Sequence, residues 1–213
     1  IELNKENQIY KNILKQDTNL FKIFANSYFI ECSKNEFEDN EIEFVSFSNM
    51  RKEEYRIKTI IKGDYVYKQN LNEKSIAHIK MIEKNIDILK KCDINTLDRY
   101  ENSTIISAYQ KDKNTLDKIL IEKLKQGNVE EIKRIMKNLY LELQNKLEVV
   151  ETDKNVFDKY KIEYEKEDIN NLTFIKYGFW DMILQNIFYI DNKYFFYDQE
   201  WIEENIPIEF LVY

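Results

Sequence analysis

The spacing of apolar residues changes along the chain, from the alternation typical of strands to the three- and four-residue period of helices. An early helix is expected over 3–17, followed by an aromatic, strand-like stretch over 21–32. Alternating segments and a hairpin turn at Lys62-Gly63-Asp64 then predict three strands, over 42–47, 55–61 and 65–68. The first part of the chain therefore favours an antiparallel sheet.

The helical period begins after residue 70. Asn72 is a suitable N-cap for a helix whose apolar positions are Ile76, Ile79, Ile82, Ile86 and Leu89. The apolar run 105–109 predicts a short buried strand, and 151–171 is polar and irregular. Two amphipathic helices are expected over 114–125 and 128–149, and a hairpin over 187–190 and 194–197. This order predicts an α+β fold with a strand-rich first lobe and a helix-rich second lobe, divided near 107–113.

Composition narrows the classes of function. The 32 basic and 39 acidic residues give a net charge of −7 and are interspersed, which disfavours nucleic acid as a partner. Three glycines leave no glycine-rich phosphate loop, so both the P-loop and the Rossmann fingerprint are absent. The two cysteines, Cys32 and Cys92, form no metal-binding motif, and a reducing cytoplasm is expected.

Targeting signals are also missing from the printed sequence. It contains no apolar segment of membrane-spanning length and no secretory leader. Its first residue is Ile1 rather than methionine, which suggests a module of a longer protein.

The segment 178–201 carries the strongest candidate chemistry. Asp181 is followed five residues later by Asn186, and Asp198 comes directly after the predicted hairpin. Carboxylates and a neutral amide oxygen are suitable ligands for a hard cation such as Mg²⁺. Two acids and an amide in this order therefore predict a site for a metal-bound nucleotide and a hydroxyl group. The alternative is structural, with Asp181 capping a turn and Asp198 ending a strand.

This arrangement resembles the protein-kinase-like fold, particularly the small-molecule branch of choline kinases and aminoglycoside phosphotransferases. The resemblance covers roughly residues 42–201, and Asp198-Gln199-Glu200 is similar to the Asp-aromatic-Glu signature of choline kinases. The same segment is also similar to parts of bacterial proteins linked to surface-polysaccharide glycosyltransferases. The expected architecture is bilobal, with an N-lobe over 1–109 and a C-lobe over 110–213.

The resemblance implies a role for each matching residue. Asp181 would accept or orient the proton of the substrate hydroxyl, and Asn186 and Asp198 would hold magnesium between the phosphates of ATP. Lys68 would contact the phosphates and pair with a helix glutamate, Glu83 rather than Glu73. The backbone of Ser107, Ala108 and Tyr109 would meet the adenine edge, whatever their side chains.

Several features depart from the family pattern. The turn FSNMRKEEY has no glycine and offers Arg51 or Lys52 as cations instead, and Phe179 stands where the family has histidine. The chain ends fifteen residues after Asp198, so the C-lobe looks truncated. The implied function is phosphate transfer from ATP-Mg to a small-molecule or saccharide hydroxyl. The alternatives are a catalytically silent kinase-like module beside a glycosyltransferase or methyltransferase, and an α+β interaction domain without a ligand.

Individual residues also have simpler interpretations. Lys68 can be an edge-strand lysine, and Glu83 a solvated helix residue. His78 is the single histidine and sits beside the apolar stripe of its helix, so it is expected to be packed or at the surface rather than catalytic. The aromatic residues around the hairpin are expected in the core rather than stacked on bases. Trp201 either lines a pocket for a cationic or sugar substrate or simply packs.

Overall fold

A computed structural model describes residues 42–151, 155–165 and 169–211. These residues belong to one compact unit that runs from Asn40 to Tyr213. The helix expected over 3–17 and the strand expected over 21–32 lie outside the described residues. The predicted division at 109/110 falls at the end of a strand inside this unit and stays a prediction.

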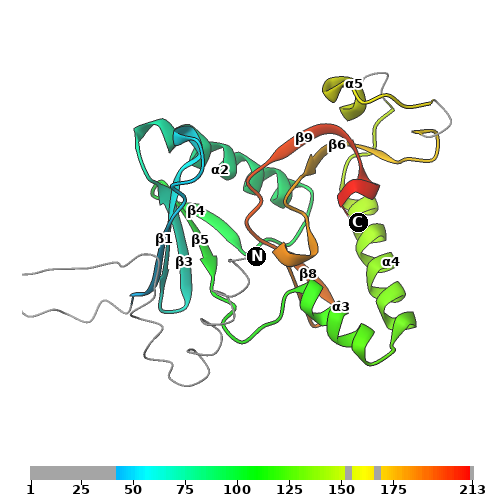
Figure 1. The fold of residues 1–213 in the computed structure, drawn as a ribbon, viewed down its shortest axis with the longest axis horizontal. Coiled ribbons are helices and arrows are strands. Elements are labelled where there is room, and N and C mark those ends of the chain that lie inside the picture. The colour runs from blue at the N-terminus through cyan, green and yellow to red at the C-terminus, as the bar shows by residue number, and fades with distance from the viewer. Residues whose placement is uncertain (1–41, 152–154, 166–168, 212–213) are drawn as a thin grey trace, which may run out of the picture. The chain divides into compact units, whose positions relative to one another are not determined.

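The fold is α+β, and its largest element is a five-stranded antiparallel sheet in the order β1-β2-β3-β5-β4 (Figure 1). The strands are β1 (Ile42–Phe47), β2 (Ile57–Lys62), β3 (Tyr65–Asn70), β4 (Asp98–Glu101) and β5 (Thr104–Ala108). Gly63, at the β2–β3 turn, has φ +53°, a value that glycine adopts without steric cost. Four of these strands follow the sequence prediction. β4, with the sequence DRYE, has no apolar alternation, and its pairing with β5 is what makes it a strand.

One helix packs against this sheet. The short 3-10 helix η3 (Glu73–Ser75) continues into α2 (Ile76–Lys91), and the Asn72 side chain accepts a hydrogen bond from the Ser75 amide, as expected of a cap. The apolar face of α2 meets β2 and β5 in a small core of Ile57, Ile79, Ile82, Ile86 and Ile105. Burial of this stripe fixes the helix on the sheet.

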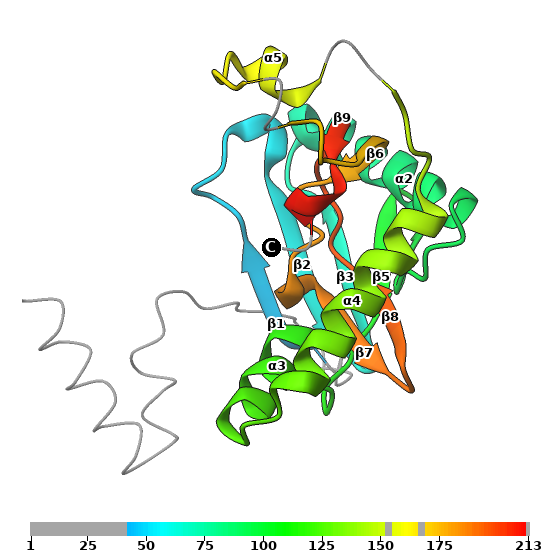
Figure 2. The same cartoon turned by 90° about the vertical axis from the view of Figure 1, so that its right-hand side faces the viewer.

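The second part of the described chain has its own, larger core. Its helices are α3 (Leu116–Lys125), α4 (Val129–Lys146) and α5 (Val156–Tyr160), with the 3-10 turns η4 (Leu184–Asn186) and η5 (Ile208–Leu211). Its strands form two pairs, β6 (Phe174–Phe179) with β9 (Ile202–Pro207) and β7 (Ile187–Ile190) with β8 (Lys193–Phe196). Figure 2 shows α3 and α4 beside the β7–β8 hairpin, where the Tyr194 hydroxyl donates to Ile135 O at 2.7 Å.

The hairpin and the two long helices confirm the sequence prediction, with changed ends. The tip of β7–β8 is a two-residue turn, because Asp191 and Asn192 both adopt positive φ. The prediction missed the β6–β9 pair, and 151–171 is not irregular throughout, because it contains α5. β9 begins directly after the candidate site, so the β6–β9 pair holds both ends of the segment from Asp181 to Trp201.

Gly178 lies in β6 at a point where the backbone passes close to β9. A Cβ at this position would lie 2.4 Å from Ile206 Cγ2 and 3.3 Å from Ile175 Cδ1. We therefore expect Gly178→Ala to lower the free energy of unfolding by about 1–3 kcal/mol through overpacking, measured by urea denaturation. Ile206→Ala removes the clashing methyl group, so the double variant should lose less stability than the sum of the two single variants. Additive losses would contradict this explanation.

No helix among the described residues is long and apolar enough to cross a membrane.

Candidate functional site

A cavity of about 200 Å³ lies where β3 and β5 meet the end of the β7–β8 hairpin. It is lined by residues from these strands and from the segments that follow them, namely Val66, Lys68, Leu97, Ser107, Ala108, Tyr109, Gln110, Phe188, Tyr197 and Asp198. Five of the eight predicted site residues therefore line one cavity: Lys68, Ser107, Ala108, Tyr109 and Asp198. They come from parts of the sequence up to 130 positions apart.

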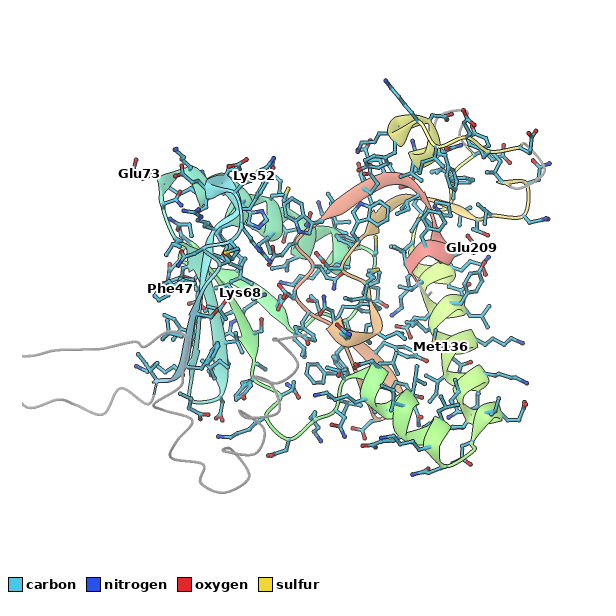
Figure 3. The ribbon with its side chains drawn as sticks, in the orientation of Figure 1. Phe47, Lys52, Lys68, Glu73, Met136 and Glu209 are labelled. Atoms are coloured by element: carbon cyan, nitrogen blue, oxygen red, sulfur yellow. The ribbon has the colours of Figure 1, made fainter. Side chains whose placement is uncertain are left out.

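Lys68 and Asp198 form an ion pair at this cavity. Lys68 lies in β3 between Thr59 of β2 and Ile105 of β5, and Figure 3 shows it on the sheet. Its side chain is 13% exposed and that of Asp198 is 33% exposed, so the pair is partly shielded from water. An ammonium can neutralise phosphate oxygens, and a carboxylate can bind a metal ion.

Asp181 and Asn186 are held in the same loop cluster as Asp198. The Asn186 amide donates to Asp181 O at 3.1 Å, and Asn186 lies opposite Tyr197 at the open end of the hairpin. Asp181 Oδ2 accepts the backbone amides of Glu200 at 2.9 Å and Trp201 at 3.1 Å. Asp181 and Asn186 are thus bonded directly, whereas Asp198 is linked to Asp181 through the Glu200 amide, which also lies 3.1 Å from Asp198 O. One oxygen of Asp181 also performs the capping role that the structural interpretation gave it.

Gln199 completes this turn. Its Nε2 donates to Asp181 O and to Tyr197 O, both at 2.8 Å, and its side chain is fully buried. This glutamine occupies the middle position of the Asp198-Gln199-Glu200 triplet. It links the segment before the hairpin to the segment after it.

Glu200 is the centre of a buried charged cluster that the sequence analysis did not single out. Its Oε2 contacts His78 Nε2 at 3.0 Å and the Arg51 guanidinium. Since the carboxylate is only an acceptor, His78 Nε2 carries the hydrogen. Asn85, two turns further along α2, donates to the backbone oxygens of Gln199 and Glu200, each at 3.0 Å. His78 and Asn85, on the buried polar face of α2, therefore hold Gln199 and Glu200 of the triplet by hydrogen bonds. His78 is packed, and Trp201 lies tilted against its ring and edge-to-face with Tyr55.

Asp98, in β4, is a second residue that sequence reasoning missed. It accepts the Ser107 hydroxyl on one oxygen and the Asp198 amide on the other, at 2.8 Å for the latter. Ser107 therefore has a defined side-chain contact, which the expectation about the 107–109 backbone did not include. No local pattern marks Asp98, because only the pairing of β4 with β5 brings it opposite Ser107.

Two other predicted features differ in the structure. Lys68 makes its ion pair with Asp198, not with Glu83, which is half-buried in α2; Glu73 lies far from Lys68 in Figure 3. The backbone amide of Tyr109 donates to Asp64 O at 2.8 Å, so it is not free for a nucleobase. Of the two cations proposed for the glycine-free turn, Arg51 is the one that reaches the site, through Glu200.

Asp198 and Asn186 suit a magnesium ion only if phosphate oxygens supply further ligands. No group of three His, Cys, Asp or Glu side chains in the described ranges is arranged to hold a metal by itself. Mg²⁺ is commonly held by one or two protein oxygens with substrate phosphates and water. Asp198 offers a carboxylate, and Asn186 donates through nitrogen, which leaves its Oδ1 for a cation.

Burial and charge set the ionisation of the carboxyl groups. Burial raises the pKa of Asp98 and of Asp181, although hydrogen bonds to each carboxylate oppose the rise. Burial also opposes ionisation of Glu200. There the hydrogen bond from His78, the charge of Lys68 and the Arg51 guanidinium outweigh it and lower the pKa to about 2.

Glu200 should consequently stabilise the fold in a pH-dependent way. Its pKa is about 2 in the folded chain and near 4.5 when unperturbed, so its contribution is complete above about pH 4.5 and is lost as the pH falls toward 2. A shift of this size corresponds to roughly 3 kcal/mol. We expect the difference in unfolding free energy between the wild type and Glu200→Gln to be largest near pH 7 and to shrink toward pH 3. Glu130→Gln, at an exposed position, is the control, and a difference that does not vary with pH would contradict the assignment.

No protein-family model, no curated protein and no solved structure matches this chain.

Proposed function

We propose that the chain is a kinase-like phosphotransferase module that transfers phosphate from ATP-Mg to the hydroxyl of a small molecule or saccharide. The observation that carries the proposal is the cavity bounded by Lys68, Asp198 and residues 107–109. The two hydrophobic cores, one under the five-stranded sheet and one among α3, α4 and the small strand pairs, are compatible with a bilobal arrangement.

The cavity suits an adenine ring. Its walls are largely apolar, with Val66 from β3, Leu97 before β4 and Phe188 from β7. The 107–109 backbone supplies polar groups on one side, although the Tyr109 amide is already paired. Ligand sites of this kind combine apolar walls with a few fixed polar groups.

The phosphates would lie at the charged end of the cavity. Lys68 would exchange its contact with Asp198 for a contact with phosphate oxygens, and Asp198 and Asn186 Oδ1 would hold the metal ion. Magnesium supplies neutralisation of the charge on the transferred phosphoryl group. Arg51 lies close enough to Glu200, two residues after Asp198, to add a further cation at this end.

Asp181 would orient the acceptor hydroxyl and take its proton. The backbone amides of Glu200 and Trp201 fix its Oδ2, and Oδ1 would face the substrate. Burial raises its pKa, which makes the carboxylate a better base than an exposed aspartate. The hydrogen bonds to Oδ2 keep the group aligned as it works.

The cheapest test is thermal unfolding of the chain with ATP, with MgCl₂ and with both. At a hundredfold excess over the dissociation constant, a ligand that binds the folded chain adds about 2.7 kcal/mol to apparent stability. We expect the largest shift with ATP and magnesium together, and a smaller one for Lys68→Met, which removes the ammonium but keeps an apolar side chain. Absence of any shift with ATP, with or without magnesium, would exclude a nucleotide site.

A catalytically silent module is the second candidate, and one observation favours it. The protein itself satisfies the charged groups of the site, with Lys68 on Asp198, Arg51 on Glu200 and two backbone amides on Asp181. Such a site can bind ligand for structural or scaffolding purposes, for example beside a glycosyltransferase or methyltransferase domain. Nucleotide binding without turnover would support this candidate.

A further inference from the structure

Asp98 is an unusual residue for an edge strand, because its carboxylate is buried. The residue is 4% exposed, and burial of a carboxylate is costly unless its oxygens accept hydrogen bonds. Both oxygens of Asp98 do so, from Ser107 and from the backbone of Asp198. Neither bond belongs to the β4–β5 backbone ladder, so the carboxylate is not required to form the strand.

The contact with Asp198 ends a short parallel pairing between two distant segments. Phe196 N donates to Asn95 O, and Leu97 N donates to Phe196 O, both at 2.9 Å. Tyr197 N donates to Asn186 O on the other side, so the next donor that faces the first segment is the Asp198 amide, and it meets the Asp98 side chain instead of a backbone oxygen. Asp98 therefore extends the pairing by one residue, to the point where the chain turns.

The Asp98 contact holds Asp198 in an uncommon backbone conformation. Its φ is +60°, in the left-handed region, which aspartate adopts at a smaller cost than most residues with a Cβ. The conformation directs its carboxylate to Lys68 at the rim of the cavity. Without a fixed amide, the backbone at Asp198 can relax and move the carboxylate away from Lys68.

We infer that Asp98 is a positioning residue for the metal-binding carboxylate, with Ser107 orienting Asp98 in turn. The inference rests on the proposed function. Asp98 connects the two ends of the cavity. Ser107 belongs to the segment expected to meet adenine, and Asp198 belongs to the end expected to meet magnesium and phosphate. The connection runs through one buried side chain, from the Ser107 hydroxyl to the Asp198 amide.

Asp98→Ala tests this, because alanine has no acceptor and both hydrogen bonds are lost. Binding of adenosine, of ATP and of ATP with MgCl₂ to the full chain is measured by calorimetry. We expect the gain in ATP affinity on adding magnesium to fall by about 10–100-fold, as for other residues that orient a metal ligand, with adenosine affinity changed by less than about threefold. The matched control is Glu101→Ala, which removes a carboxylate from an exposed position of the same strand.

Each outcome is decisive. An unchanged gain from magnesium in Asp98→Ala, or equal losses of adenosine and ATP affinity, would overturn the positioning role. If Asp98→Ala does not fold, Ser107→Ala replaces it, and an unreduced gain from magnesium in that variant overturns the inference. A wild-type chain that binds neither adenosine nor ATP refutes the proposed function itself, and the inference falls with it. A wild-type chain that binds both, followed by a negative result for Asp98, refutes the inference alone.

Discussion

Replacing Asp198 with asparagine is expected to abolish the magnesium-dependent part of ATP binding and to lower phosphate transfer by on the order of 10³-fold. The variant keeps the shape of the side chain and an oxygen that can accept from Lys68. Asparagine also tolerates the left-handed backbone found here, φ +60°, so the fold should survive. What is lost is the negative charge that a divalent cation requires.

Asp191→Asn provides the control for this variant. Asp191 also has positive φ, at +50°, but lies at the tip of the hairpin, away from the cavity. Calorimetric titration of ATP with and without MgCl₂, together with a turnover assay, measures the effect. If Asp198→Asn retains the magnesium dependence of the wild type, Asp198 is not the metal ligand.

Replacing Asp181 with asparagine is the second change with a large expected effect. The asparagine oxygen can still accept the Glu200 and Trp201 amides, so the turn is preserved. The proton acceptor is removed, and loss of a general base typically lowers the rate by about 10²–10⁴-fold. We expect turnover to fall by this factor while ATP affinity stays close to that of the wild type.

This variant also separates the enzyme from the silent module. Turnover is compared with that of Asp158→Asn, whose carboxylate caps α5 outside the site. A wild-type chain that binds ATP without turnover identifies the silent module. Turnover that Asp181→Asn leaves unchanged would assign Asp181 only its structural role at the turn.

Local sequence was sufficient to predict the helices and turns that have strong residue patterns. The Ile-rich stripe of α2 and the Gly63 turn are visible within a few residues of sequence, because helix period and turn conformation are local properties. β6 and β9 were missed for the opposite reason, because their strand character comes from pairing with each other across the whole candidate site. β4 was missed because its sequence DRYE has no apolar alternation, although it pairs with the adjacent β5 across the turn at Asn102 and Ser103.

Some features of the candidate site were likewise predictable from the sequence, and others depended on the tertiary structure. The sequence by itself determined that Asn186 and Asp198 lie near the two ends of one hairpin, with Asp181 five residues before Asn186, because the hairpin forms from neighbouring segments. The choice of Asp198 over Glu83 as the partner of Lys68 was decided only by the tertiary structure. The buried contacts of Asp98 and of Glu200 were decided in the same way. Contacts between residues roughly 100 or more positions apart depend on how sheets and helices pack, and no local pattern of residues encodes that packing.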